Sequence, residues 1–379
     1  MVKGLWDAGR LILVLILLTA GARAEAFETP ARAAILVDLE ADQVLFAKNI
    51  DEPLPTASMS KLMTAFMVFE RLKDGRISLD DTFPVSEKAW RKGGSKMFVE
   101  VGSRVRVEDL LRGIIIQSGN DACIVVAEAL AGSEEEFARQ MTERARELGL
   151  SNTNLKNASG WPDPEHLMSV RDLATLATLL IRSFPEYYPL YSEKEFTYNG
   201  IRQYSRNPLL HRDPSADGLK TGYTDEAGYG LVASALRDDR RLILVVAGLD
   251  DADQRGEEAL RMLEYGYNQF KNYRLFSTGE AVDLANVWLG DHTTVPLVLE
   301  EEVVVSLTPE GRRNLEVKVV YDGPIPAPVA PGSPLAELEI TAPGIEPRRL
   351  PLVAGEEVRA VNLLGRVTSA LGYLIWGPS

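Results

Sequence analysis

The stretch Pro55-Thr56-Ala57-Ser58-Met59-Ser60-Lys61-Leu62-Met63-Thr64 marks the point at which this chain changes from strand to helix. Before it, apolar runs at residues 33–37 and 44–46 flank a short polar segment and predict a β-hairpin. From Ser58 onward the apolar side chains recur at helical spacing, as Leu62, Ala65, Phe66 and Phe69. The pattern therefore predicts that Ser58 begins a helix whose apolar face is buried.

Helices dominate the middle of the chain, and strands return after it. Helical patterns cover residues 107–116, residues 121–131, a segment that Ser133 caps and that ends near Gly149, a segment from Ser169 to before Pro185, and residues 259–270. Asn199-Gly200 predicts a hairpin turn, and residues 231–236 and 242–249 read as strands around Asp238-Asp239. This order predicts a mixed α/β (α+β) domain with an antiparallel sheet and a helical subdomain.

A second, small all-β domain is predicted after about Tyr273. Short β-like segments occupy residues 282–288, 294–299, 303–307, 315–321, 335–340 and 348–353. The proline-rich segment 323–328 is a loop that no central strand could contain. We expect the first domain to span residues 25–272 and the β-rich domain residues 273–360.

Both ends of the chain carry signals of their own. Residues 1–24 combine a positive start, an apolar run from Leu11 to Ala20 and Ala22-Arg23-Ala24, which predicts a secretory signal peptide rather than an uncleaved anchor. Residues 361–379 place Leu364, Val367, Leu371 and Leu374 on one helical face, which predicts an amphipathic helix lying in a membrane surface. The alternative is a terminal helix packed on the β domain, and Gly365 and Gly372 weaken either helix.

Charge and composition limit the binding partners, metals and cofactors that are expected. The formal charge is −14, and because residues 1–24 carry a net +2, their removal leaves −16, so nucleic acid is not an expected partner. Cys123 is the only cysteine and lies in an apolar run, where we expect a small buried residue. His166, His211 and His292 have no ligand spacing, and no metal site or cofactor is predicted.

The first chemical motif is Ser58-Met59-Ser60-Lys61, or S-x-x-K. A helix brings residues three apart onto one face, so Lys61 can reach the Ser58 hydroxyl. A serine hydroxyl is a poor nucleophile without a nearby base, and burial or a second positive charge would lower the pKa of Lys61 toward that role. The start of the helix would favour a developing oxyanion.

Two further motifs are weak alone. Ser118-Gly119-Asn120 lies between two predicted helices, where Ser118 could relay a proton and Asn120 could donate to a substrate carbonyl, although a helix cap is the simpler reading. Lys220-Thr221-Gly222 precedes a predicted strand. Lys220 and Thr221 could hold a substrate carboxylate, and Gly222 would let a substrate peptide lie against the strand.

The order of the three motifs is that of one known active site. With the residues around them, they resemble the low-molecular-weight penicillin-binding proteins that are D-alanyl-D-alanine carboxypeptidases, over roughly residues 27–270. The resemblance rests on residues 55–64, Gly94-Ser95-Lys96-Met97-Phe98, Gln117-Ser118-Gly119-Asn120-Asp121-Ala122, Asp217-Gly218-Leu219-Lys220-Thr221-Gly222 and Ala227-Gly228-Tyr229. The β domain and the terminal amphipathic helix also look like that family, and the fold implied is a penicillin-binding, β-lactamase-like transpeptidase domain.

The resemblance implies a serine carboxypeptidase that removes the terminal D-alanine from peptidoglycan pentapeptides. Ser58 would attack the carbonyl between the two D-alanines, Lys61 would take its proton, and the backbone N–H groups of Ser58 and Tyr223 would form the oxyanion hole. Arg206 and Arg255 match family positions near the substrate carboxylate. Penicillin and other β-lactams would acylate the same serine and leave slowly. The protein would be periplasmic and attached to the membrane surface by its terminal helix.

Some residues depart from the family, and rival functions share the motifs. Ser205 and Trp161 stand where the family often has Asn and a smaller apolar residue, which affects substrate detail rather than reaction type. A β-lactamase of the common class would carry Glu-x-x-Leu-Asn, whereas Glu165 is followed by His-Leu-Met-Ser. An endopeptidase acting on D-alanyl cross-links stays open. A wall-binding scaffold with a dead site is disfavoured because the motif residues are intact.

Overall fold

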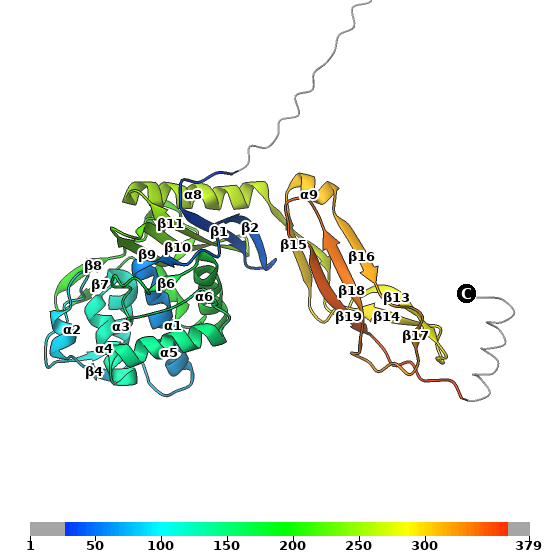
Figure 1. The fold of residues 1–379 in the computed structure, drawn as a ribbon, viewed down its shortest axis with the longest axis horizontal. Coiled ribbons are helices and arrows are strands. Elements are labelled where there is room, and N and C mark those ends of the chain that lie inside the picture. Colours follow the sequence, from blue (N-terminus) through cyan, green and yellow to red (C-terminus); the bar gives the residue numbers. More distant parts are fainter. Residues whose placement is uncertain (1–26, 363–379) are drawn as a thin grey trace, which may run out of the picture.

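The computed structural model describes residues 27–362, which form two bodies joined end to end (Figure 1). The first contains a sheet and most of the helices, and the second is a β domain that extends away from it. Apolar side chains of the two bodies form separate clusters, since the buried members of the second body's cluster run from Ala285 to Val358 and the side chains packed against them begin at Tyr273. The predicted α+β class with an antiparallel sheet and a C-terminal β domain is confirmed.

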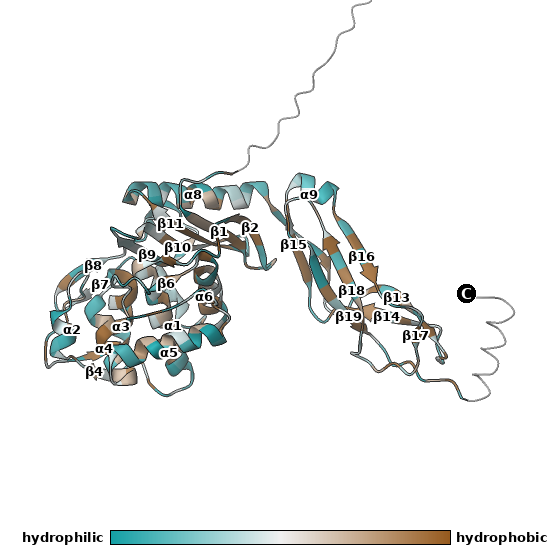
Figure 2. Cartoon of the chain, viewed as in Figure 1, coloured by the Kyte–Doolittle hydropathy of each residue, from teal (hydrophilic) through white to brown (hydrophobic). Residues whose placement is uncertain are grey.

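A five-stranded antiparallel sheet organises the first body, in the order β2-β1-β11-β10-β9. Its strands are β1 (Ala33–Asp38), β2 (Gln43–Lys48), β9 (Ala216–Thr224), β10 (Gly228–Arg237) and β11 (Arg240–Leu249). The strands β10 and β11 are strongly hydrophobic, and α8 (Ala252–Gln269) covers one face with its polar side outward (Figure 2). Helix α6 (Val170–Ser183) packs against the other face. Strand β9 is left at an edge of the sheet.

The helical subdomain lies on the side of the sheet opposite α8 (Figure 1). Its helices are η1 (Ala57–Ser60), α1 (Lys61–Lys73), α2 (Glu87–Arg91), α3 (Val107–Arg112), η2 (Gly113–Gln117), α4 (Asn120–Ala131) and α5 (Glu134–Glu147). As predicted, the Ser133 side chain caps α5 by accepting from the Glu136 amide. The same arrangement at Ser169 caps α6.

Two predicted helices differ in detail. The segment predicted as one helix over 107–116 is α helix only to Arg112 and then widens into a π-helical turn, η2. A side chain at Gly113 would collide with the Met97 sulfur, so the turn packs closely against the segment before it. Helix α8 begins seven residues before the predicted start because Asp251 caps it, with its carboxylate accepting from the Gln254 amide at 2.7 Å.

Short elements complete the first body. They are the two-stranded pairs β3 (Leu54–Pro55) with β6 (Leu167–Met168), β4 (Thr82–Pro84) with β5 (Arg104–Arg106), and β7 (Glu195–Tyr198) with β8 (Ile201–Tyr204), and the helices η3 (Tyr188–Ser192) and α7 (Leu209–Arg212). The pair β7–β8 turns at Asn199-Gly200, as the sequence predicts, and both turn residues have positive φ.

The second body is built from a six-stranded sheet and a two-stranded one. The larger has the order β16-β18-β19-β14-β13-β17, and β12 pairs with β15. The elements are β12 (Lys271–Phe276), β13 (Ala281–Trp288), β14 (Thr294–Val298), β15 (Val303–Leu307), α9 (Pro309–Arg313), β16 (Glu316–Val320), β17 (Ile325–Pro326), β18 (Pro334–Thr341) and β19 (Arg348–Ala354).

Buried polar contacts join the two bodies. The Asp38 carboxylate pairs with Arg240 at 2.7 Å, and Arg240 donates to the Ser306 hydroxyl of the β domain at 3.0 Å. The Gln43 amide exchanges two hydrogen bonds with the Ser306 backbone. Arg348 reaches back to the Ala41 carbonyl. These contacts hold the β domain at the end of the sheet remote from β9.

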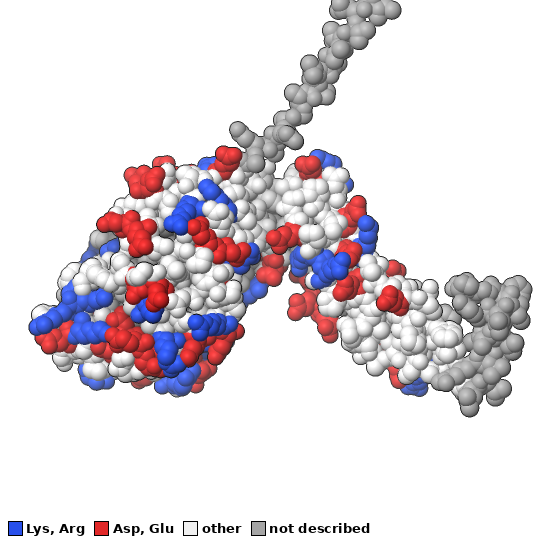
Figure 3. Space-filling model, viewed as in Figure 1, with Lys and Arg blue, Asp and Glu red and all other residues white. Residues whose placement is uncertain are grey.

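The predicted signal peptide, residues 1–24, and nearly all of the predicted terminal helix, residues 361–379, lie outside the described residues. Between residues 27 and 362, no helix is long and apolar enough to span a bilayer. In the view of Figure 3, acidic and basic side chains are interspersed over the first body and no broad basic face is present.

Candidate active site

Ser58 lies on η1, a 3₁₀ turn that leads directly into α1. Lys61 is the first residue of α1 and only 1% exposed. Its Nζ lies 2.8 Å from the Ser58 Oγ, so the predicted serine–lysine contact is present. Ser58 itself is half-buried and lines a cleft of about 670 Å³. The serine is therefore open to a ligand while its neighbouring lysine is shielded from water.

Lys61 is oriented by three acceptors. Besides Ser58, its Nζ donates to the Asn120 Oδ1 at 2.8 Å and to the Ser159 backbone carbonyl at 2.5 Å. An amide oxygen and a carbonyl oxygen can only accept, whereas a hydroxyl can also donate. If Lys61 loses a proton, the Ser58 hydroxyl is thus the one partner of the three that can donate to its lone pair.

Burial makes that deprotonation accessible. Burial is the largest cause that lowers the pKa of Lys61, the positive charges of Arg206 and Lys92 act in the same direction, and the Asp121 carboxylate opposes them, with a resulting pKa of about 8. The pKa of Lys220 is lowered well below its usual value, first by burial and then by Lys61. Of the two causes that the sequence analysis named, burial therefore has the larger effect on the pKa of both lysines.

The second motif reaches the site through Asn120. Ser118 ends the π-helical turn with φ +65°, a left-handed conformation that costs energy for a residue with a Cβ, and it is buried. Asn120 starts α4, and its side chain bridges Lys61 and the Gly93 carbonyl, to which Nδ2 donates at 3.0 Å. Asn120 therefore positions Lys61 and also lines the cleft.

Asp121 supports the site in a way that the sequence analysis missed. Its buried carboxylate accepts from the backbone amides of Met97, Phe98 and Val99 at 2.9, 2.9 and 3.2 Å, and from the Ala122 amide at 2.9 Å. The carboxylate thereby fixes the segment that follows Gly94 and Ser95, which line the cleft. The signal in the sequence that could have revealed this role is the position of Asp121 directly after the S-x-N motif.

The third motif lies on the edge strand β9. Lys220 and Thr221 are buried, and Gly222 pairs with Gly230 of β10. A Cβ at Gly222 would lie 2.6 Å from the Thr56 carbonyl oxygen, beside the turn that carries Ser58. The glycine is therefore required by packing of β9 against η1, whereas the sequence analysis assigned it to contact with a substrate peptide.

Arg206 and Arg255 add positive charge near Lys220. Arg206 donates to the Ser95 hydroxyl at 2.8 Å, and burial lowers its pKa. Arg255, on α8, is 9% exposed, lies over the Tyr229 ring, and has a buried Nε with no hydrogen-bond partner among the described residues. Each arginine lowers the pKa of Lys220. Such a concentration of incompletely paired cations fits an anionic group of a ligand.

Aromatic and acidic side chains form the rest of the cleft. Tyr223 follows the third motif, is 48% exposed, stacks on Tyr229 and donates to the Asp225 carboxylate at 2.7 Å. Trp161 lines the same cleft, and the Lys92 Nζ lies 4.4 Å from the centroid of its ring. The larger residue at position 161 thus forms part of a wall of the cleft.

The loop before Trp161 was also missed by the sequence analysis. The Asn157 side chain accepts from the amides of Ser159 and Trp161, and it donates to the Trp161 carbonyl. A Cβ at Gly160 would collide with the Ala57 carbonyl oxygen, so this loop packs tightly on η1. The loop presents the Ser159 carbonyl to Lys61. A backbone acceptor contributed by a distant loop leaves no motif in a sequence.

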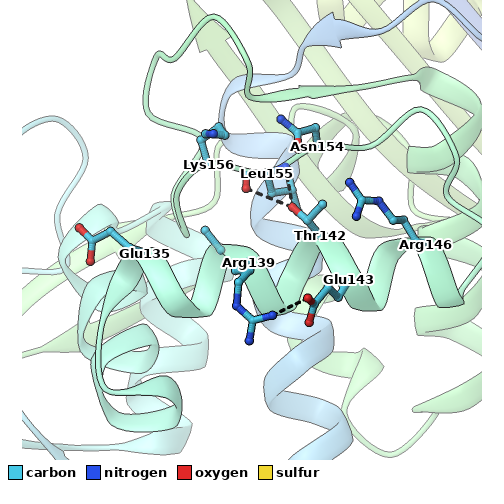
Figure 4. Close-up of a pocket in the computed structure, with 9 residues that line it drawn as sticks. Glu135, Arg139, Thr142, Glu143, Arg146, Asn154, Leu155 and Lys156 are labelled. Atoms are coloured by element: carbon cyan, nitrogen blue, oxygen red, sulfur yellow. Dashed lines mark hydrogen bonds and ion pairs between the residues drawn. The ribbon is translucent and has the colours of Figure 1, made fainter.

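Other features lie outside the three motifs. A second cleft of about 440 Å³ runs along α5, and its charged side chains include the Arg139–Glu143 ion pair (Figure 4). Cys123 is fully buried, as predicted, and burial raises its pKa to about 12. Over residues 27–362 there is no group of three or more His, Cys, Asp or Glu side chains that could hold a metal ion.

Comparison with known families matches both bodies of the chain. Residues 20–251 match the family described as D-alanyl-D-alanine carboxypeptidase, and residues 270–360 match the C-terminal domain of penicillin-binding protein 5. The first match covers more than half of the chain and includes all three motifs. The second covers the β domain.

Individual relatives agree with these matches. The chain is 38% identical to the D-alanyl-D-alanine carboxypeptidase DacC of Escherichia coli over 95% of this chain and 93% of that protein. The crystal structure of penicillin-binding protein 5 from Haemophilus influenzae is 32% identical, with a TM-score of 0.82 over 88% of this chain and 99% of the other. The ampicillin-bound penicillin-binding protein D2 from Listeria monocytogenes is 31% identical, with a TM-score of 0.59 over 64% and 99% of the two chains.

Proposed function

The chain belongs to the D-alanyl-D-alanine carboxypeptidase family of serine peptidases, and we propose that Ser58 is the nucleophile with which it removes the terminal D-alanine of peptidoglycan pentapeptides. The observation that carries this assignment is the contact between the half-buried Ser58 and the fully buried Lys61 at 2.8 Å. Lys61 combines a lowered pKa with a geometry in which its lone pair can face only Ser58.

Acylation begins with neutral Lys61. It takes the Ser58 proton while Oγ bonds to the carbonyl carbon between the two D-alanines. The resulting oxyanion is held by the backbone N–H groups of Ser58 and Tyr223, which flank the cleft from η1 and β9. The positive end of α1 favours the same charge.

The substrate carboxylate binds at the basic end of the site. Lys220, Thr221, Arg206 and Arg255 supply the cations and the hydroxyl, and the unpaired Nε of Arg255 supports this role. The peptide adds to the free edge of β9 as a further strand. The leaving amine takes a proton through Ser118 as the C–N bond breaks, and D-alanine departs.

Water completes the cycle. It attacks the Ser58 ester, Lys61 accepts the water proton, and the proton returns to the Ser58 oxygen as the shortened peptide leaves. β-Lactams acylate Ser58 by the same route, and we assign them as covalent inhibitors because a solved relative of this fold carries ampicillin. No cofactor takes part in these steps.

The proposed location follows from the two ends of the chain. Residues 1–24 act as a signal peptide that exports the protein to the periplasm, and residues 361–379 form an amphipathic helix that attaches it to the membrane surface. Fractionation of cells expressing the full chain and a chain ending at residue 360 tests the attachment. We expect the shortened protein in the soluble periplasmic fraction. Continued sedimentation with membranes would contradict an anchor in residues 361–379.

Labelling with fluorescent penicillin tests the nucleophile. We expect covalent labelling of the full chain, an adduct located by mass spectrometry on the peptide that contains Ser58, and no labelling of Ser58→Ala. Ser60→Ala is a matched control, since the Ser60 hydroxyl donates to the Ala57 carbonyl rather than to Lys61. Labelling that persists in Ser58→Ala would refute the assignment.

A further inference from the structure

Strand β9 and the turn after it carry opposite charges on the two sides of Tyr223, which lines the cleft that contains Ser58. Before Tyr223, Lys220 lies near Arg206 and Arg255, whose charges lower its pKa. After Tyr223, the turn between β9 and β10 contributes the carboxylates of Asp225 and Glu226 to the lining. Both carboxylates are exposed, and no residue between 27 and 362 forms an ion pair with either of them.

The positions of these charges determine which side chains each residue of a bound peptide would contact. With its C-terminal carboxylate at Lys220 and its scissile carbonyl at Ser58, a peptide lying antiparallel to β9 continues past Tyr223 toward Thr224. Successive residues advance by about 3.3 Å, so the third residue from the C-terminus lies beside the β9–β10 turn. Its side chain therefore emerges next to Asp225 and Glu226.

The surroundings of the two carboxylates suit an alkylammonium group. Asp225 is oriented by the Tyr223 hydroxyl at 2.7 Å, and the Tyr223 ring is braced by Tyr229, with the ring centroids 4.2 Å apart. The hydrogen bond to Asp225 and its charge help to raise the pKa of Tyr223 to about 12, so the phenol remains a donor. Trp161 offers an apolar surface in the same cleft. The Lys92 ammonium group already lies over the Trp161 ring. A second cation would be repelled from that ring and attracted to the carboxylates of the β9–β10 turn.

We propose that Asp225 and Glu226 form a subsite for a cationic side chain on the third residue from the C-terminus of the peptide substrate, with Trp161 packing against its methylene groups. The inference rests on the proposed function, because it takes the direction of the peptide from the positions of Ser58 and Lys220. It makes these residues determinants of specificity rather than parts of the catalytic machinery.

Two peptides that differ only in this charge test the proposal with the full-length protein. They are Nα-acetyl-L-lysyl-D-alanyl-D-alanine and the Nα,Nε-diacetyl peptide, and kcat/KM is measured from D-alanine release. We expect the free amine to be preferred by about fivefold, the upper range for exposed charge pairs. The preference should shrink as salt is added. Asp225→Asn/Glu226→Gln should bring the ratio close to one, and the amide oxygen that replaces the Asp225 carboxylate can still accept from Tyr223.

Two control variants distinguish the charge of the proposed subsite from a change in total protein charge and from loss of apolar contact. Asp238→Asn/Asp239→Asn removes two charges from the exposed β10–β11 turn, at residues whose positive φ asparagine tolerates, and should keep the wild-type ratio. Trp161→Ala should lower kcat/KM for both peptides and preserve the ratio, since both carry the same methylene groups.

The proposal is overturned if the wild type prefers neither peptide, or if Asp225→Asn/Glu226→Gln keeps the full preference. Release of D-alanine from the diacetyl peptide measures the proposed function by itself. If that peptide is cleaved without any preference for the free amine, the carboxypeptidase assignment stands and the subsite fails. If neither peptide is cleaved, the proposed function fails first.

Discussion

We expect the ionisation of Lys61 to determine how acylation of Ser58 depends on pH. Burial, together with the surrounding charges, lowers the lysine pKa from 10.5 to about 8, and because one pKa unit is about 1.36 kcal/mol, the charged form is disfavoured by about 3 kcal/mol. Only neutral Lys61 can accept the Ser58 proton, so acylation is lost as pH falls through the pKa. The neutral fraction is about one tenth at pH 7 and about one hundredth at pH 6.

Stopped-flow measurement of acylation by a fluorescent penicillin between pH 5.5 and 9.5 provides the assay. We expect the second-order rate constant to rise about tenfold per pH unit at low pH and to level off above a midpoint near 8. Lys92→Gln should move the midpoint upward, because the Lys92 charge lowers the pKa of Lys61. A rate that is flat from pH 6 to 9, or a midpoint near the ordinary lysine value, would refute the role of Lys61 as base.

Three further predictions concern the support of the site. Asp121→Asn should lower the free energy of unfolding by about 2–3 kcal/mol in urea denaturation, since one amide oxygen replaces a carboxylate that accepts from four backbone amides; an unchanged midpoint and slope would contradict this. Gly222→Ala should slow penicillin acylation about 100-fold, because its Cβ would displace the turn at Thr56, and wild-type acylation by a folded variant would argue against that packing. Arg255→Gln should lower kcat/KM about tenfold for a peptide acid but little for its C-terminal amide, and equal losses for both would show that Arg255 does not bind the carboxylate.

Local signals in the sequence predicted much of the fold. Ser133 and Ser169 begin helices because their side chains satisfy free amides of the first turn, which depends only on neighbouring residues. Asn199-Gly200 forms its hairpin because both residues adopt positive φ readily. The start of α8 was predicted too late because the cap at Asp251 precedes the apolar pattern.

The geometry of the candidate active site was predictable where short spacings in the sequence encode it. Lys61 reaches Ser58 because three residues span one helical turn. The parts that sequence analysis missed depend on contacts between distant segments. The Ser159 carbonyl approaches Lys61 from 98 residues away, and the Asp121 carboxylate holds amides 22 to 24 residues before it. The widened turn that ends at Ser118 arises from close packing of Gly113 on Met97, which no local pattern records.

The central claim is that this chain uses Ser58 to cleave the terminal D-alanine from a peptidoglycan stem. The most direct test is D-alanine release from a purified pentapeptide, measured with the full chain, with Ser58→Ala, and with the full chain treated beforehand with penicillin. We expect the untreated protein to release one D-alanine from each pentapeptide and the other two samples to release none. Release that survives both the substitution and penicillin would contradict the central claim, as would cleavage of cross-linked dimers with no release from the pentapeptide.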